Sequence, residues 1–241
     1  MHSHFSEVAD KWNNKVWAQD KDFALDIVKF ADLRGDEIAL YVGVGTGEIA
    51  TKFNVAEMTG LDICKEMMEE NKVLKRHKLI VSDAHNLPFL DNSFDFVFAR
   101  NLLKHVDKPR KVINEMKRVV KEGGIVFTAE SCVLKKWDKP VPNYCVRTVE
   151  PNHFSFQTHE EIIGFYKVNQ FTSIEDTIYK YRSKWLKKWV QSSKSSDVVR
   201  KKILRKYQHA SSSFINRHKV VFTEDDDIIS TIFWSFVKGT K

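Results

Sequence analysis

Residues 38–50 have the sequence IALYVGVGTGEIA, in which an apolar run meets glycines at alternate positions, Gly43, Gly45 and Gly47. The run predicts a buried strand, and the glycines predict a tight turn that leads into a helix. Glycine suits such a turn because a Cβ would block positive-φ conformations or the approach of a ligand. The stretch therefore predicts a site where a ligand lies against bare backbone and unpaired helix N–H groups.

An acidic residue follows at the spacing of a second strand. Residues 59–62, TGLD, end at Asp62, nineteen positions after Gly43. A βαβ unit presents a carboxylate to ribose hydroxyls about 20 residues after its glycine turn. The dinucleotide fingerprint has its third glycine where this chain has Glu48, and an acid there is unfavourable for a pyrophosphate. A nucleoside without phosphate fits better, and S-adenosylmethionine is the common one.

Several further segments complete a known pattern. The segments are 42–47 (VGVGTG), 59–68 (TGLDICKEMM), 82–89 (SDAHNLPF), 93–97 (SFDFV) and 115–124 (EMKRVVKEGG). Together they resemble the class I S-adenosylmethionine-dependent methyltransferases. More narrowly, they are similar to the small-molecule branch that includes the ubiquinone and menaquinone C-methyltransferases (methyltransferase type 11). The resemblance spans about residues 5–130 and thins out after them.

The resemblance implies an α/β fold in one domain over residues 1–241. The expected sheet is Rossmann-like and mostly parallel, with seven strands, an antiparallel last strand and helices on both faces. An N-terminal helical lid is expected over 1–34 and a cofactor-binding core over 35–131. A segment that covers the methyl acceptor is expected over 132–157, and a basic helical insert over 183–220 precedes the last strand.

The resemblance also implies the cofactor, S-adenosyl-L-methionine, and the residues that bind it. These are Tyr41, Gly43, Gly45, Gly47, Asp62, Ile63, Met67, Asp83, Ala84 and Arg100. In the family, the residue that matches Asp83 accepts from the adenine amino group, and the backbone that matches Ala84 faces the ring. Tyr41 departs from the pattern, because the family usually has an acid there that helps to hold the methionine ammonium. We expect Glu130 or main-chain carbonyls to take that role.

Apolar periodicity predicts the remaining elements. Strands are expected at 38–42, 55–61, 79–82, 94–99, 125–129, 171–181 and 226–237. Helices are expected within 5–33, at 46–53, 65–75, 109–120 and 158–166, and in the basic insert. Residues 135–156, rich in proline and aromatic side chains, are expected to be irregular.

His105 is the candidate catalytic base. Methyl transfer is a displacement at a sulfonium carbon, so the protein mainly supplies position, exclusion of water and sometimes a base. His105 follows the fourth predicted strand, and imidazole titrates near neutrality. The family often has two histidines here, and this chain has Lys104 in place of the first. A structural role for His105 is the alternative.

Four residues are candidates for binding the acceptor. Tyr144, Arg147 and His153 lie in the segment that the family uses over the acceptor, and Trp17 lies in the N-terminal helical segment. A guanidinium among aromatic side chains suits an anionic or aromatic small molecule. An ordinary surface arginine and a tryptophan that packs in the core are the alternatives.

Composition and charge narrow the class of protein. Three cysteines lack any metal-binding spacing, and no run is long and apolar enough for a membrane span. We therefore expect a reduced, cytoplasmic protein without a metal site. The net charge is +7, and thirteen lysines and arginines against one acid fall within residues 180–220. Solvated helix faces explain such a segment, so nucleic acid is not the expected partner. The alternatives are an RNA methyltransferase that uses this insert, and a cofactor-binding protein that has lost catalysis.

Overall fold

The computed structural model describes residues 2–14, 20–70, 78–151 and 153–241. The strands are β1 (Ile38–Val42), β2 (Glu57–Asp62), β3 (Lys78–Val81), β4 (Phe94–Arg100), β5 (Val120–Cys132), β6 (Thr172–Lys184), β7 (Val221–Phe222) and β8 (Ile228–Thr240). The α-helices are α1 (His2–Val8), α2 (Lys21–Ala31), α3 (Lys65–Glu69), α4 (Pro109–Val119), α5 (Pro140–Val149), α6 (His159–Val168), α7 (Leu186–Ser192), α8 (Asp197–Gln208) and α9 (Ser212–His218). Short 3₁₀ helices are η1 (Ala9–Asn14), η3 (Ala50–Lys52), η4 (Leu103–His105) and η5 (Lys136–Asp138).

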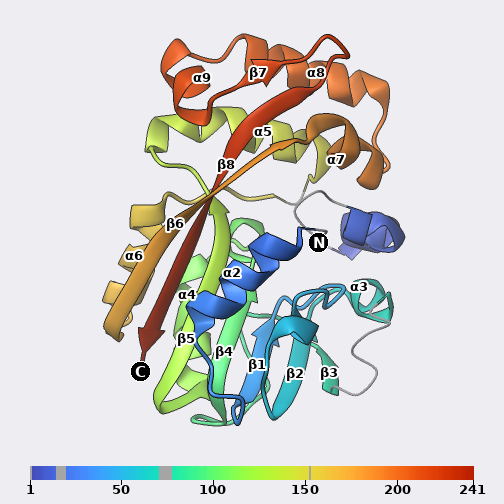
Figure 1. Ribbon diagram of the computed structural model, residues 1–241. Coiled ribbons are helices and arrows are strands. Elements are labelled where there is room, and N and C mark those ends of the chain that lie inside the picture. Colours follow the sequence, from blue (N-terminus) through green and yellow to red (C-terminus); the bar gives the residue numbers. More distant parts are fainter. Residues whose placement is uncertain (1, 15–19, 71–77, 152) are drawn as a thin grey trace.

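The described strands form one sheet in the order β3-β2-β1-β4-β5-β8-β6, with β7 paired to β8 (Figure 1). Strands β1 to β5 pair in parallel, whereas β8 is antiparallel to β5, β6 and β7. The mostly parallel sheet and its antiparallel last strand are confirmed. The sheet has eight strands and not the expected seven, because Val221–Phe222 adds a short pairing at the start of β8. The strand order reverses between β1 and β4, where doubly wound sheets bind ligands.

Helices cover both faces of the sheet. On one face α2 buries Phe23, Ile27 and Ala31 against the strands. On the other, α4 and α6 bury side chains that include Met116 and Tyr166. Because both faces are covered, the central strands are apolar runs without alternation, as parallel strands in α/β proteins are.

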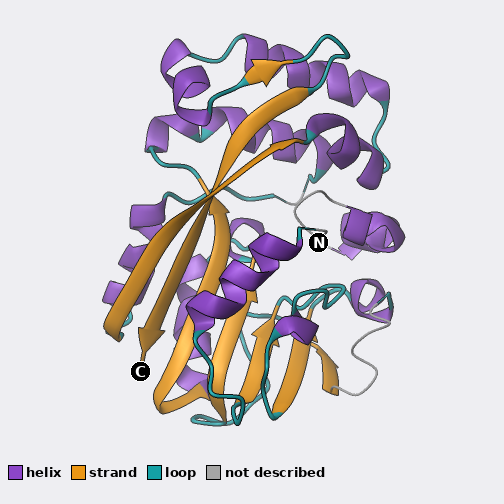
Figure 2. Cartoon of the chain, in the orientation of Figure 1, coloured by secondary structure: helices purple, strands orange, loops and turns teal. Residues whose placement is uncertain are grey.

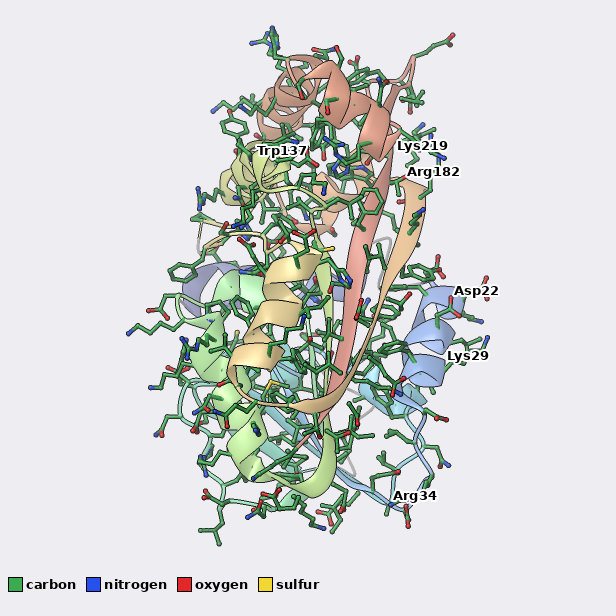
Figure 3. The ribbon with its side chains drawn as sticks, turned by 90° about the vertical axis from the view of Figure 1, so that its left-hand side faces the viewer. Asp22, Lys29, Arg34, Trp137, Arg182 and Lys219 are labelled. Atoms are coloured by element: carbon green, nitrogen blue, oxygen red, sulfur yellow. The ribbon has the colours of Figure 1, made fainter. Side chains whose placement is uncertain are left out.

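A second layer of helices lies beyond the parallel strands. Strands β6 and β8 extend past the rest of the sheet, and α5, α7, α8 and α9 pack around the extension (Figures 1 and 2). We call α5, α7, α8 and α9 the helical cap. The Trp185 indole donates to Ser230 Oγ at 2.8 Å, which ties the start of α7 to β8. Arg182 donates to the Lys219 carbonyl at 2.7 Å, which ties β6 to the end of α9 (Figure 3).

Two expectations about local structure were wrong. Residues 135–156 are not irregular, since they contain η5 and the three-turn helix α5. Prolines at the start of α5 suit a first helical turn, and Val141, Cys145 and Val149 recur every four residues and are buried in the cap. The helix expected over 46–53 is only the short η3. The backbone N–H groups of Gly47 and Ala50 donate to the carbonyls of Val44 and Gly47, three residues back, which is the pattern of a 3₁₀ turn and not of an α-helix.

Several predicted bounds also differ. Strand β5 begins directly after α4 and is longer than the expected 125–129, because its first residues pair with β4 across an irregularity in register. Strand β6 runs beyond its predicted end because it continues into the helical cap. Strand β8 begins two residues later than predicted and runs to Thr240, where it pairs with Ile125 and Thr172 at the end of the sheet away from the cap. Helix α3 ends at Glu69, and the rest of the helix predicted over 65–75 lies outside the described residues from 71 onward.

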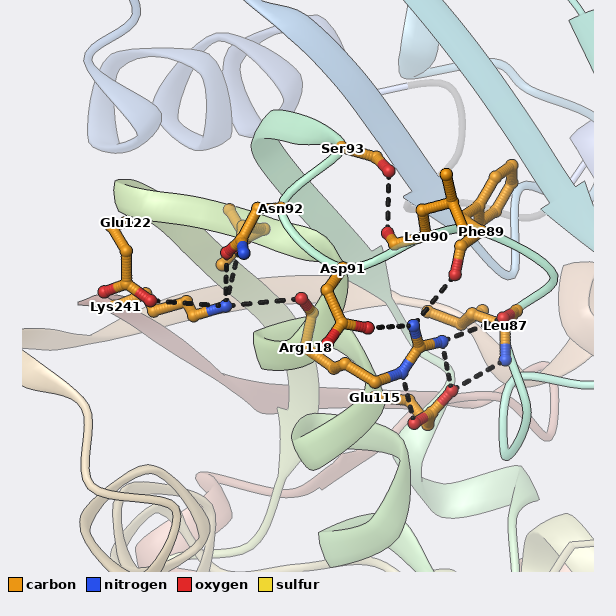
Figure 4. A network of polar contacts seen from close by, with 11 residues as sticks. Leu87, Phe89, Leu90, Asp91, Asn92, Ser93, Glu115, Arg118, Glu122 and Lys241 are labelled. Carbon is orange, nitrogen blue, oxygen red and sulfur yellow. Dashed lines mark hydrogen bonds and ion pairs between the residues drawn. The ribbon is translucent and has the colours of Figure 1, made fainter.

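A polar cluster lies at the end of the sheet where β4 begins (Figure 4). Arg118 on α4 donates to Glu115 and Asp91, and to the carbonyls of Leu87 and Phe89, at 2.8 to 2.9 Å. The hydrogen bonds from Arg118 lower the pKa of the Glu115 carboxyl, although burial acts in the opposite direction. This cluster fixes the loop before β4 to α4. Among the described residues, no helix is long and apolar enough to cross a membrane.

Candidate active site

The glycine turn after β1 has the predicted conformation. Gly43, Gly45 and Gly47 have φ angles of +71°, +52° and +69°, in the left-handed region that glycine occupies without strain. The amide of Gly43 donates to the carbonyl of Leu61 at 2.7 Å, which ties the turn to β2. A Cβ on Gly45 would stand 3.4 Å from Met67 Cε. The turn thus keeps its backbone open toward the space between it and α3.

Asp62, at the end of β2, is held by backbone amides. Gly45 N donates to Asp62 Oδ2 at 2.8 Å, and Cys64 N donates to Asp62 Oδ1 at 2.9 Å. Each carboxylate oxygen has a second lone pair, so the group can also accept from two ligand hydroxyls. The predicted pairing of turn and carboxylate is therefore formed by direct contact.

A cavity opens along the carboxyl ends of β1 to β4, and we call it the edge cavity. Of the ten residues predicted to bind the cofactor, nine line it; these are Tyr41, Gly43, Gly45, Asp62, Ile63, Met67, Asp83, Ala84 and Arg100. Gly47 does not line it and contributes the third positive φ of the turn. Parallel strands bring their carboxyl ends to one edge, so residues spread over sixty positions of sequence meet here.

Sequence reasoning missed two polar residues of the edge cavity. His85 donates its backbone N–H to Asp83 Oδ1 at 2.8 Å, and its ring Nδ1 lies 2.7 Å from the same oxygen. His85 Nε2 is 3.1 Å from Asp107 Oδ1. Burial raises the pKa of Asp83, but the hydrogen bonds from His85 outweigh burial and lower it below its ordinary value. Only the neighbouring position of His85 in the sequence hinted at this contact.

A second cavity, the aromatic chamber, lies between the end of the sheet and the helical cap. Its rings are Phe156, Trp185, Trp189, Tyr207, Phe214, Phe233 and Trp234. The chamber shares Trp12, Asn101 and His105 with the edge cavity, so the two cavities meet at these residues. Burial raises the pKa of the Cys132 and Cys145 thiols in its wall to about 12, so both line it as neutral groups.

Several polar groups of the aromatic chamber lie at its junction with the edge cavity, and His218, Ser230 and Thr231 line its other end. Lys104 Nζ donates to Asn101 Oδ1 at 3.1 Å and to Ser131 Oγ at 2.8 Å, and lies 5.2 Å from the centre of the Phe156 ring. His105 Nε2 is 3.8 Å from Glu150 Oε2. The chamber therefore has a polar end beside the edge cavity and a largely aromatic end under the cap.

Comparisons with known proteins match this geometry. A family model described as a methyltransferase domain matches residues 40–128. The uncharacterized methyltransferase YcgJ of Bacillus subtilis is 26% identical over 245 residues, which cover 94% of this chain and 92% of that protein. The demethylmenaquinone methyltransferase of Thermotoga maritima is 33% identical over 135 residues, or 52% of this chain and 59% of that relative. The chain thus matches less than two thirds of that enzyme's length. Residues 40–128 are a methyltransferase domain.

Solved structures agree on the fold. The crystal structure of YcgJ from Bacillus subtilis superposes with a TM-score of 0.82 at 22% identity, over 90% of this chain and 97% of that one. Phosphoethanolamine N-methyltransferase 2 of Haemonchus contortus, solved in complex with S-adenosyl-L-methionine, gives a TM-score of 0.62 at 22% identity, over 98% of this chain and 57% of that one. At these identities, the solved structures show that this chain shares the methyltransferase fold.

The edge cavity has features that suit S-adenosylmethionine, the cofactor that the sequence resemblance implies. Asp62 presents oriented acceptor oxygens suited to ribose hydroxyls, and the bare turn at Gly43 and Gly45 leaves room for a nucleoside. Glu130 was expected to hold the methionine ammonium, but it does not line the cavity and is fully buried, where its Oε1 accepts from Leu102 N at 2.9 Å. Burial raises the pKa of Glu130 to about 7.

Of the residues predicted to bind the acceptor, Tyr144, Arg147 and His153 line neither the edge cavity nor the aromatic chamber. Tyr144 and Arg147 line a shallow outer hollow beside α5, and the Arg147 guanidinium donates to the carbonyls of His153 and Phe154. His153 is buried with its Nε2 2.8 Å from Asn143 Oδ1, and burial lowers its pKa to about 3. Trp17 lies outside the described residues. Their role in acceptor binding stays a prediction.

Proposed function

We propose that this methyltransferase acts on a small molecule that binds in the aromatic chamber. The observation that supports it is the junction at Asn101 and His105, where the edge cavity opens against the chamber. Methyl transfer requires the acceptor atom to lie in line with the donor, and adjoining cavities provide such an approach. When bound, S-adenosylmethionine supplies an electrophilic methyl group on a positively charged sulfur.

The chamber wall indicates the character of the acceptor. Eight aromatic residues, Trp12 among them, favour a flat or largely apolar body. The Trp234 indole N–H has no hydrogen-bond partner among the described residues, so it can donate to a polar group of the acceptor. The buried Lys104 ammonium at the polar end favours a head group that is anionic or carries a lone pair. The demethylmenaquinone methyltransferases among the relatives are consistent with such an acceptor.

His105 is the proposed base when the acceptor atom carries a proton. Its ring lies at the junction and packs edge-on against Phe5 at 5.3 Å, which limits the orientations of the imidazole. The Glu150 carboxylate near Nε2 stabilises the imidazolium that forms when His105 takes the proton. Residues 1–34, which contribute Phe5 and Trp12 to the edge cavity, are proposed as a lid, and 132–157 as the segment that covers the acceptor.

Transfer of a labelled methyl group tests this function. The purified protein is incubated with methyl-tritiated S-adenosylmethionine, and either a low-molecular-weight cell extract or total RNA. We expect label in the small-molecule fraction, and roughly 10²-fold slower labelling by His105→Gln at unchanged cofactor affinity. Asp62→Ala, which removes a predicted cofactor contact, serves as the inactive control. Label confined to RNA would instead support the RNA methyltransferase alternative, and no label at normal cofactor affinity would support loss of catalysis.

A further inference from the structure

The edge cavity has a nucleoside half and a second half that differ in charge. Asp62 ends β2 and Asp83 follows β3, and both are acids that can accept from a nucleoside. Tyr41 on β1 and Arg100 at the end of β4 line the other half, at the point where the strand order reverses. A ligand that places its ribose at Asp62 therefore extends its remaining atoms toward Tyr41 and Arg100.

The second half of the edge cavity contains one anion and one cation in its wall. Glu48 follows the glycine turn and Arg100 ends β4, and both line the cavity together with Tyr41. The three groups interact electrostatically with one another. Burial raises the pKa of the Tyr41 phenol far above its ordinary range, so Tyr41 is neutral and the charges come from Glu48 and Arg100.

Both charged groups are held in place by their surroundings. The Arg100 guanidinium is 5.3 Å from the centre of the Phe23 ring and 5.5 Å from that of Trp234, so aromatic faces enclose it. Glu48 is half-buried, and its charge is balanced by Arg100 and by Lys52. The amino-acid half of S-adenosylmethionine carries an ammonium and a carboxylate, which require one partner of each sign.

We propose that Glu48 binds the methionine ammonium of the cofactor and that Arg100 binds its carboxylate. Glu48 and Arg100 then do the work of the acid that the family has at position 41, where this chain has Tyr41. Glu130 takes no part, because its carboxylate accepts from Leu102 N and does not line the cavity. Glu48 is the acid that broke the dinucleotide pattern in the sequence. The inference depends on the identity of the cofactor and not on that of the acceptor.

Two ligands that share the adenosine group but differ in the amino-acid group test whether Glu48 and Arg100 bind that amino-acid group. S-adenosylhomocysteine carries the adenosine and the amino acid, whereas 5′-methylthioadenosine carries the adenosine and sulfur alone. Isothermal titration calorimetry measures the affinity of each ligand for the wild type, Glu48→Gln and Arg100→Lys. We expect each variant to weaken S-adenosylhomocysteine about 10- to 100-fold, the usual size for a charged hydrogen bond, and to leave methylthioadenosine unchanged.

Matched variants complete the experiment. Asp62→Asn should weaken both ligands, because both carry the ribose, and Glu160→Gln, an exposed acid on α6, should weaken neither. Thermal unfolding shows that each protein is folded, and Glu48→Gln alone decides the matter if Arg100→Lys fails to fold. An equal loss for both ligands in Glu48→Gln, or no loss for S-adenosylhomocysteine, overturns the proposal. A wild type that binds neither ligand overturns the cofactor assignment with it.

Discussion

The edge cavity and the aromatic chamber adjoin each other, yet they are built in different ways. The edge cavity consists of short turns that each follow a parallel strand, and backbone amides hold its central acid, Asp62. The chamber consists of side chains from four α-helices, two 3₁₀ helices, loops, β5 and β8, which lie between Trp12 and Trp234 in the sequence. A site that depends on backbone conformation can be recognised from a short stretch of sequence. A site that depends on packing between distant elements cannot.

The largest effect is expected in the edge cavity, on the affinity for S-adenosylhomocysteine when Asp62 is replaced. Asp62→Ala removes acceptors for two ribose hydroxyls and leaves the amides of Gly45 and Cys64 without their partner. Hydrogen bonds to a charged group contribute about 1.5 to 3 kcal/mol each, so S-adenosylhomocysteine should bind at least ~100-fold more weakly. Calorimetry gives the affinity. An unchanged affinity in Asp62→Ala would show that the edge cavity does not bind the nucleoside.

The edge cavity could be predicted because each part carries its own signal. Gly43, Gly45 and Gly47 occupy the positive-φ conformations that their spacing indicated. The parallel sheet then brings Asp62 to the turn without further information, since strands of one sheet end at one edge. Arg100 was placed by the same rule. Glu48 could not be assigned a role, because its interaction with Arg100 depends on side chains that approach only in the folded protein.

The aromatic chamber could not be predicted for two physical reasons. Its cap residues, among them Trp189 and Tyr207, repeat at helical spacing, which indicates a buried face but not what that face covers. The helix α5 was hidden by prolines and aromatic residues that are also typical of loops. Arg147 attracted a functional interpretation by its aromatic neighbours, and in the structure it satisfies main-chain carbonyls.

The next largest effect concerns Glu130, which is fully buried, accepts from Leu102 N, and precedes the chamber residues Ser131 and Cys132 in β5. A carboxyl whose folded-state pKa is raised to about 7 stabilises the fold below its unfolded pKa of about 4.3, and this contribution is lost as the pH rises toward 7. The amide that Glu130→Gln introduces cannot ionise. The free energy of unfolding of the variant minus that of the wild type should therefore increase by roughly 2 kcal/mol from pH 5 to pH 8. Urea unfolding at both pH values measures the difference. If Glu130→Gln differed from the wild type in free energy of unfolding by the same amount at pH 5 and at pH 8, the raised pKa would be contradicted.

A smaller effect is expected from filling the aromatic chamber. Cys145 on α5 is buried in its wall, and Cys145→Phe adds volume where the acceptor is proposed to bind. We expect the acceptor KM to rise by about 10-fold, the size that steric changes of about 1 to 3 kcal/mol produce. The affinity for S-adenosylhomocysteine should not change. Thr148→Val, at a half-buried position of the same helix that lines neither cavity, is the matched control. Normal acceptor kinetics in Cys145→Phe would place the acceptor outside the chamber.

The smallest effect is expected from the charges of the helical cap. Helix α8 turns Ile203, Leu204 and Tyr207 inward, and its exposed Lys201 and Lys202 reach neither cavity. The aromatic residues of α7 and α8, Trp189 and Tyr207, line the chamber wall and are not exposed as a nucleic-acid reader's would be. The double substitution of both lysines by glutamine should therefore leave methyl transfer and cofactor affinity unchanged. Filter binding to total RNA should show only weak association, which falls steeply between about 50 and 200 mM salt. Salt-resistant RNA binding that the double variant abolishes would reverse the assignment, because it would make the outer surface of the cap the binding site in place of its interior.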